Sequence, residues 1–428
     1  MTRLRLLPVR DGRLLVAVRG LRSVSQGALV VDFALYLRAL HWSGAGIGAV
    51  LTASMVVGIL LTAVLGPLSD RVGCKRLLLG FEAGRVLAAL AALSSGAPSL
   101  LVPAAFLGQY GRGGNGTAGP FAAVEQAWLA HLMPREKWVS LYSLNSAAGL
   151  VGQAAGALLA VVPAWLSPWL PGALAFRPLF GLVLVTSLIA AALISQVPEV
   201  ARPPRRATVV TPARAEHQAV CRQENRLLLR LALGNLIQGV GLGLSGPMIA
   251  YWFAVSFGQG PKLIGPVMAG GFLLSGAASV IAGRLAQRHG IVPVVVGMQL
   301  VGVGLVAVLP LVPVLSMAAG VQIARSLFNR GTDGVRQALS SGLVRSERRG
   351  FAASLNSVSV SAPRAFGPLF AGMLFDAGWL AMPFLIAAGF QTAYLWLYAA
   401  SFTKHDRESR RSAAVALAPA ASVAAGSV

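Results

Sequence analysis

Two long apolar runs of this chain are joined by a short charged segment, Gly66-Pro67-Leu68-Ser69-Asp70-Arg71-Val72-Gly73-Cys74-Lys75-Arg76. The runs cover residues 47–68 and 77–93, and each approaches the roughly 20 apolar residues that cross a bilayer core of about 30 Å. A short basic turn between two such spans is expected on the cytoplasmic side of a membrane. The segment therefore predicts a hinge between two membrane helices.

The composition of the whole chain is that of a membrane protein. Of its 428 residues, 56% are hydrophobic and only 12% are charged, whereas a soluble domain carries about 25% charged residues. The apolar runs are continuous, unlike the alternating ten-residue segments of a transmembrane β-barrel. We therefore expect an all-α polytopic protein that lies in a lipid bilayer.

The net charge of +22 would indicate a nucleic-acid partner in a soluble protein, but the distribution of the charges indicates otherwise. Lys and Arg gather at the two ends of the chain and in alternate loops, while the other loops hold only Arg38, Arg177 and Lys262. This positive-inside pattern predicts a multi-pass protein of the cell (inner, cytoplasmic) membrane with both termini cytoplasmic. Anionic lipid headgroups, and no nucleic acid, are the expected counterpart of the basic face.

Twelve membrane helices in two six-helix halves are expected. Residues 1–198 form the N-terminal half, 199–228 a cytoplasmic linker rich in Pro and Arg, 229–403 the C-terminal half, and 404–428 a cytoplasmic tail that we expect to be disordered or loosely surface-associated from Ser412 onward. The predicted spans are 16–38, 45–69, 76–94, 98–121, 138–163, 178–196, 229–255, 263–286, 291–310, 314–337, 351–374 and 380–402.

The two halves repeat each other in sequence. One constant offset aligns Asn145 with Asn356, and a slightly larger one aligns Gly73 with Gly290. Parallel repeats of this kind place a substrate site at their interface near the bilayer midplane. Further pairs at these offsets are Gln126 with Gln337, Gly156 with Gly367, Gly66 with Gly283, and Arg71 with Arg288.

The charged segment resembles the loop signature of the major facilitator superfamily, Gly-x-x-x-Asp-Arg-x-Gly-x-[Lys/Arg]-[Lys/Arg], which joins the second and third helices. The resemblance implies a two-half secondary transporter that works by alternating access. It also implies that Asp70 clamps the start of the eleventh helix near Phe351 and holds the cytoplasmic side shut. The other charges of the segment are explained as well by membrane topology alone. The six matching positions are Gly66, Asp70, Arg71, Gly73, Lys75 and Arg76, while Cys74 stands where Arg is frequent.

Two candidate sites for proton coupling or substrate binding lie within predicted spans. Asp32 falls midway along the first span, where a charge costs at least about 2.5–3.5 kcal/mol; it could carry a proton, bind a cationic substrate or pair structurally with an arginine. Arg112 and Asn115 lie in a segment similar to the Arg-x-x-Gln-Gly pattern of proton-coupled members, with Asn in place of Gln. The resemblance implies proton transfer at Arg112, which could instead bind an anion or pair with Glu125 or Asp32.

Further candidates come from the repeat. Glu125 and Arg336 are repeat-equivalent and opposite in charge, which predicts an ion pair between the halves that closes the cytoplasmic gate, although solvated helix ends explain them equally well. Gln26 and Gln238 also align, and are candidates to line a cavity or to form hydrogen bonds between helices. Glu82 and Arg85 have the spacing of an ion pair on one helix face.

The expected function is secondary transport of a small molecule by a monomer, with no cofactor and no metal. A Walker loop and metal and nucleophile motifs are absent from the sequence, which argues against an enzyme or an ATP-driven pump. The glycines at 111, 113 and 116 match the dinucleotide-binding pattern, but no βαβ unit is expected around them. Proton-coupled export of an amphipathic compound is the favoured mode. The alternatives are uptake of a small anionic metabolite, or a transport-inactive sensor with the same fold. Uptake is favoured by the arginines within predicted spans, which are Arg112, Arg325, Arg330, Arg336 and Arg364.

Overall fold

A computed structural model describes residues 3–111, 124–125, 128, 138–199, 214–342 and 349–425 of the chain. In these ranges all regular secondary structure is helical. Ten of the described helical segments are long and apolar enough to cross a membrane, so the predicted all-α polytopic fold is confirmed.

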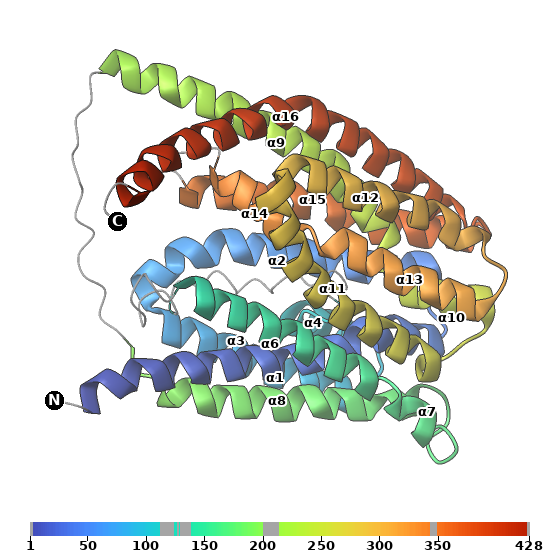
Figure 1. Ribbon diagram of the computed structural model, residues 1–428. Coiled ribbons are helices and arrows are strands. Elements are labelled where there is room, and N and C mark those ends of the chain that lie inside the picture. Colours follow the sequence, from blue (N-terminus) through green and yellow to red (C-terminus); the bar gives the residue numbers. More distant parts are fainter. Residues whose placement is uncertain are drawn as a thin grey trace.

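The helices form two groups, one from each half of the sequence (Figure 1). The N-terminal group consists of α1 (Arg3–Ala39), α2 (Gly44–Val72), α3 (Cys74–Ser94), α4 (Pro98–Gly108), α6 (Trp138–Leu159), α7 (Val162–Leu166), η2 (Gly172–Phe176) and α8 (Arg177–Gln196). The C-terminal group consists of α9 (Arg214–Ser245), α10 (Ile249–Phe257), α11 (Pro261–His289), α12 (Ile291–Val308), η3 (Leu309–Leu311), α13 (Leu315–Arg330), α14 (Asp333–Gly342), α15 (Arg349–Asp376) and α16 (Met382–Ala425).

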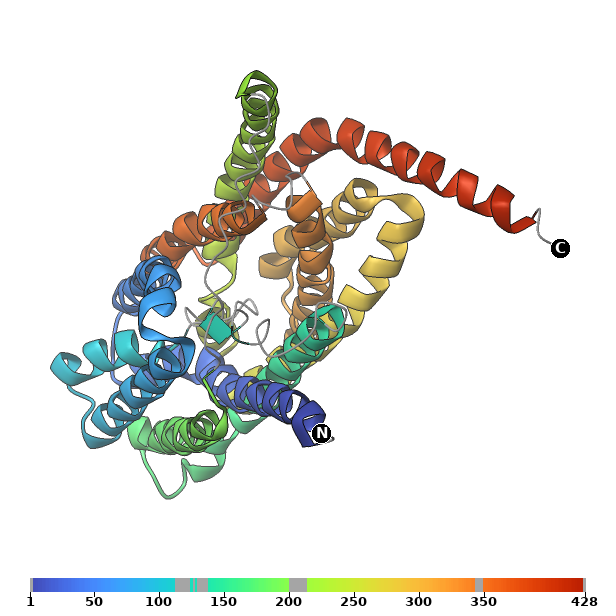
Figure 2. The ribbon, with the colours of Figure 1, turned by 90° about the vertical axis from the view of Figure 1, so that its left-hand side faces the viewer.

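Both ends of the chain lie on the same side of the molecule (Figure 1). We call this side the terminal face. The other side, which carries the connection between α10 and α11, is called the opposite face. Figure 2 views the molecule from the terminal face, with the blue and green helices of the first group beside the yellow and red helices of the second.

Five expectations about the chain's course need correction or remain open. The seventh expected span divides into α9 and α10 because Pro247 cannot donate the backbone hydrogen bond that a continuous helix needs. The tenth divides into α13 and α14. The second part of the expected linker is already helical from Arg214, and α16 continues to Ala425, since alanine has the highest helix propensity. Of the fourth span only Pro98–Gly108 is described as a helix.

The aligned glycines Gly73 and Gly290 have the same structural role. Each directly precedes a helix, α3 or α12, with φ of 96° and 98° respectively. Positive φ is accessible to glycine without steric cost, so the backbone conformation explains why the last glycine of the charged segment is a glycine.

Carboxylates cap both of these helices. Glu199 accepts a hydrogen bond from the Lys75 N–H at 3.4 Å, and Asp406 accepts one from the Ile291 N–H at 3.3 Å. Both carboxylates lie at a helix N-terminus, where the helix dipole favours negative charge.

The halves meet closely where α2 packs antiparallel against α15. A Cβ atom on Gly48 would overlap the carbonyl oxygen of Pro368, and one on Gly372 would overlap that of Gly44. The Thr52 hydroxyl accepts a hydrogen bond from the Leu369 N–H at 3.2 Å. Small residues therefore allow backbone-to-backbone contact between the halves, as is common between membrane helices.

Replacing Gly48 with Ala is expected to lower stability by about 1–3 kcal/mol, because the added methyl group must push two backbones apart. The matched control is Gly80→Ala in α3, where a Cβ atom would meet nothing within 4 Å; it should be neutral or stabilising by up to about 1 kcal/mol. Thermal unfolding in detergent measures both. Equal melting temperatures for the two variants would contradict this packing.

Candidate transport site

The two halves are fastened at the opposite face by a cap between helices. Asp376, the last residue of α15, accepts hydrogen bonds from the backbone N–H groups of Gly44 and Ala45 at 2.7 Å each. These are among the donors that a helix N-terminus leaves unpaired, and the next one, at Gly46, is bonded by Ser43 within the same half at 3.1 Å. We call the contact of Asp376 with Gly44 and Ala45 the α2–α15 latch.

Replacing Asp376 with Ala is expected to loosen the opposite face, because loss of a helix cap costs about 0.5–2 kcal/mol. A change of about 1 kcal/mol corresponds to about fivefold in the open population. The readout is maleimide labelling, from the opposite face, of a cysteine placed at buried Thr52. Ser43→Ala is the control, since it removes a cap of the same helix without touching the other half; equal labelling of the two variants would refute the latch.

A cavity of about 230 Å³ lies within the C-terminal half. It opens where two helices are interrupted, at Gly246 between α9 and α10 and beside Arg330 before α14. Interrupted helices at membrane depth are tolerated where they are buried in protein or line a cavity, and they form the substrate sites of many transporters. The polar lining residues are Gln238, Gln322, Arg325, Ser326, Asn329, Arg330, Asp333, Arg336, Gln337, Asn356, Ser357, Ser361 and Arg364.

This lining is strongly basic, with four arginines and one aspartate. Arg336 lies 3.6 Å from Asp333, bonds to Asn235 at 3.4 Å and stacks over the ring of Tyr394. Arg330 lies over the ring of Phe272, 4.7 Å from its centre. The cavity can therefore attract and orient a negatively charged group.

A second cavity of about 180 Å³ adjoins the first and lies between the halves. Arg330 and Asp333 line both cavities, and the N-terminal half contributes Arg19 from α1 and Gln153 from α6. A ligand in this region can contact both halves, as alternating access requires.

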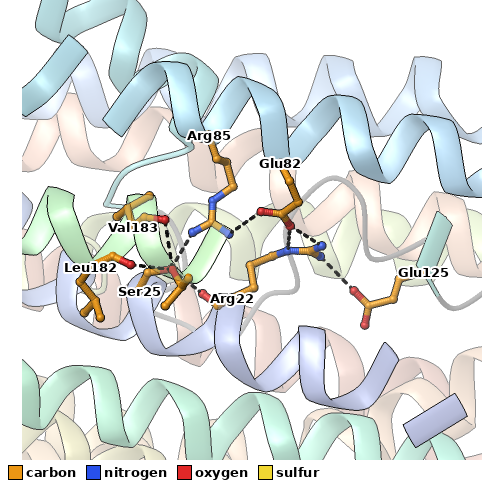
Figure 3. A network of polar contacts seen from close by, with 8 residues as sticks. Arg22, Ser25, Glu82, Arg85, Glu125, Leu182 and Val183 are labelled. Carbon is orange, nitrogen blue, oxygen red and sulfur yellow. Dashed lines mark hydrogen bonds and ion pairs between the residues drawn. The ribbon is translucent and has the colours of Figure 1, made fainter. Parts of the chain in front are cut away.

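The N-terminal half neutralises its own buried charges in a compact network (Figure 3). Arg22 of α1 donates to Glu82 at 2.9 Å and to Glu125 at 3.0 Å. Arg85 lies 3.5 Å from Glu82 and donates to Ser25 at 2.6 Å. All five side chains are buried. The predicted Glu82–Arg85 pair is thus confirmed, and Arg22 joins both glutamates to α1.

The predicted gate residues each bond within their own half in this conformation. Glu125 accepts from Arg22 and from Asn145, the latter at 3.1 Å, while Arg336 contacts Asp333 and Asn235. The structure does not bring Glu125 and Arg336 together. Their pairing stays a prediction for a conformation in which the terminal face closes.

Three predicted site residues lie in helix interiors. Asp32 is 1% exposed, and no described residue hydrogen-bonds to either of its carboxyl oxygens. Gln26 is also buried in α1, and its side-chain oxygen has no described partner. Gln238 lines the first cavity and donates to Gln299 at 3.3 Å. The structure thus places Gln238 in the lining of the first cavity, and the roles of Asp32 and Gln26 stay predictions.

The remaining predicted residues belong to the charged segment and the fourth span. Lys75 donates to the Ser195 carbonyl at 2.7 Å and fastens α3 to α8 within one half, and Arg76 is exposed. Gly73 makes the turn before α3. Arg112 and Asn115 lie outside the described residues, as do the side chains of Asp70 and Arg71 and the surroundings of Gly66, so the predicted clamp of Asp70 on α15 stays a prediction.

Sequence reasoning missed Arg19, Arg22 and Asp376. The two arginines lie in the first apolar run. A charged side chain within a membrane span costs free energy, so their position could have marked them as paired or ligand-binding. Asp376 lies just beyond the eleventh predicted span, 351–374, but nothing in the sequence indicates that it faces the start of α2.

Comparison with known proteins agrees with this architecture. Among solved structures, a mutant of the nucleoside transporter NupG is similar with a TM-score of 0.72 and 13% identity, covering 92% of this chain and 100% of that one. The D-xylose-proton symporter has a TM-score of 0.68 and 16% identity over 90% and 96% of the two chains. A bacterial homologue of the human lysosomal transporter Spinster, inward-facing and unoccupied, has a TM-score of 0.67 and 14% identity over 93% and 98%.

A relative in sequence is an uncharacterized membrane protein of Saccharomyces cerevisiae (strain ATCC 204508 / S288c), 28% identical over 150 residues. The match covers 35% of this chain and spans about a third, 33%, of that protein. The family model of the Major Facilitator Superfamily matches residues 15–229 and 231–427. The chain therefore belongs to the Major Facilitator Superfamily.

Proposed function

We propose that this protein is a secondary transporter that binds a small polar solute in the two adjoining cavities and carries it across the membrane by alternating access. The two halves would rock about these cavities, with the α2–α15 latch closing the opposite face in the conformation described here. Exchange of solute would then proceed from the terminal face.

The observation that carries the proposal is the shared lining of the cavities. Arg330 and Asp333 face both the cavity of the C-terminal half and the space that Arg19 and Gln153 line from the N-terminal half. A sensor or scaffold with this fold has no need of buried arginines that lack a bonded carboxylate, such as Arg325 and Arg364, because such charges are costly in a membrane. A transporter needs such groups because they replace the interactions with water that a solute loses when it enters the site.

Two alternatives exist for the direction of transport and the class of solute. Proton-coupled export of an amphipathic compound rests on the pattern around Arg112, outside the described residues. Uptake of a small anion rests on Arg325, Arg330, Arg336 and Arg364, which line one cavity. The geometry supports an anionic solute better than an amphipathic one. Coupling to protons is proposed through Asp32, because a buried carboxyl group without a partner is neutral when protonated and costly when ionised.

Alternating access can be tested without knowing the solute. In a variant whose Cys74 and Cys221 are replaced by Ser, a cysteine at Ser361 in the cavity lining should react with a membrane-impermeant maleimide added to either face of oriented vesicles. A cysteine at Leu60, 60% exposed on the outer surface of the helix bundle, is the control and should react from neither face. Labelling of the Ser361 position from one face alone, at every pH and solute condition, would favour a transport-inactive sensor.

A further inference from the structure

We propose that the solute is a small organic anion whose carboxylate or phosphate group is bound by Arg325 and Arg364 in the cavity of the C-terminal half. The inference rests on the proposed transport function and names the chemical class of its substrate. It depends on three observations: the neutral groups that hold these arginines, the lack of a strong counter-ion beside them, and a further cation in the adjoining cavity.

Arg325 is held in place by neutral groups alone. Its guanidinium donates to Gln322 at 3.0 Å and to the Ser245 hydroxyl at 2.7 Å, while its Nε has no described partner. The residue is 5% exposed. Because Gln322 and Ser245 fix its orientation without neutralising it, the full positive charge of Arg325 is left for a ligand.

Arg364 is a second buried cation without a bonded partner. It is 7% exposed, and neither an ion pair nor a hydrogen bond joins it to any residue that the structure describes. An isolated charge at such burial is costly, and an arginine presents a planar fork that matches carboxylate and phosphate oxygens. Arg364 therefore has the charge and the geometry to bind an anion, and a bound anion would offset the cost of burying its charge.

Asp333 is too weak a counter-ion to occupy this role. Its carboxylate interacts electrostatically with Arg336, Arg364 and Arg330, but its side chain is 59% exposed and its one ion pair, with Arg336, spans 3.6 Å. One exposed carboxylate shared among three guanidiniums leaves an excess of positive charge. In the N-terminal half, by contrast, Glu82 and Glu125 are both bonded to a single arginine.

The second cavity supplies a cation from the other half. Arg19 is 7% exposed and lines this cavity together with Arg330 and Asp333. An anion that reaches from Arg364 toward Arg19 would attract both halves at once and favour the conformation in which they approach. Together the volumes of about 230 and 180 Å³ lie toward the lower end of the roughly 300–1,000 Å³ of pockets for drug-sized ligands, which favours an anion of metabolite size.

The test measures binding of soluble probes to the purified full chain by isothermal titration calorimetry and thermal shift. Gluconate is compared with sorbitol, and glycerol 3-phosphate with glycerol, each neutral molecule having a skeleton similar to that of its anion. At least one anion should bind ten- to a hundredfold more tightly than its neutral counterpart, and Arg364→Gln or Arg325→Gln should remove that preference. The control is Arg284→Gln, an exposed arginine at the terminal face, which should keep it.

Equal binding of anions and neutral probes, or an anion preference that survives in either Arg364→Gln or Arg325→Gln, would overturn the inference. An anionic lipid headgroup has the same chemistry, so the thermal shift is repeated with phosphatidylglycerol against phosphatidylcholine. A shift that depends on Arg364 and arises from phosphatidylglycerol but from no soluble anion would also overturn it. If labelling at Ser361 alternates while no anion binds, the substrate class fails and the transport function stands; if labelling does not alternate, the transport function itself fails.

Discussion

Replacing Arg22 with Met is expected to destabilise the protein by about 3–5 kcal/mol, because buried Glu125 loses its bonded cation and buried Glu82 keeps only its longer contact with Arg85. Arg22 bonds to both Glu82 and Glu125, from α1 to two further segments of the N-terminal half, and Glu82 is 0% exposed. Methionine fills a similar volume, so the loss would come from the charge and not from a cavity. Thermal and urea unfolding in detergent provide the measurement.

Two further variants separate the charge effect from general damage. The double variant Arg22→Met/Glu125→Gln should regain much of the stability, since Glu82 keeps Arg85 as its counter-ion and Glu125 no longer carries a charge. Arg230→Met, at an exposed position of α9, should change stability by less than about 0.5 kcal/mol. If Arg22→Met behaves like Arg230→Met, the network of Figure 3 does not hold the half together.

Replacing Asp32 with Asn is expected to remove the pH dependence of the conformational equilibrium. The wild-type ratio of labelling at Ser361 from the two faces should change between pH 5.5 and 8, because an ionised carboxylate at this depth costs about 2.5–3.5 kcal/mol, on the order of 100-fold in an equilibrium. Asparagine imitates the protonated, neutral group and should hold the low-pH ratio at every pH.

The matched control for Asp32→Asn is Asp11→Asn, another buried acid of the same helix. It should leave the pH dependence of labelling intact. An unchanged pH dependence in Asp32→Asn would show that protons act elsewhere, and the proposed coupling residue would be wrong.

Much of the fold could be predicted because membrane spans are encoded locally. The charged segment at residues 66–76 indicated a connection between two helices, and the structure places the turn at Gly73 between α2 and α3. The break at Pro247 was missed, since the seventh span was predicted as continuous, although proline cannot continue a helix without losing a hydrogen bond. The helical course of the linker and tail was missed because their polar or alanine-rich sequences lack the apolar periodicity on which the prediction relied.

The site was less predictable because its contacts join distant parts of the chain. Arg22 lies 60 residues from Glu82 and 103 from Glu125, and Asp376 lies 332 residues from Gly44. The sequence marked Arg325 and Arg364 as arginines within spans, but only the fold places them in one cavity without a bonded carboxylate. Spacing along one helix, as for Glu82 and Arg85, is the kind of contact that sequence predicts.

The repeat also explains why the two halves differ in charge. Glu82 and Gln299 are equivalent by the same offset as Gly73 and Gly290. Glu82 forms ion pairs with arginines, whereas Gln299 forms amide and hydroxyl hydrogen bonds with Gln238 and Thr332. Glu82 is thereby paired within the N-terminal half, while Arg325 and Arg364 of the C-terminal cavity have no bonded carboxylate among the described residues and remain available to a solute.

The most direct test of alternating access measures both faces at once by double electron–electron resonance. One pair of spin labels replaces Trp169 and Trp379, which are exposed near the opposite face at 76% and 57%. A second pair replaces Gln196 and His289, exposed at the terminal face. We predict two populations in reciprocal relation, in which lengthening of the first distance accompanies shortening of the second as pH or anion concentration changes. A single, unchanging distance at both faces under all these conditions would contradict alternating access.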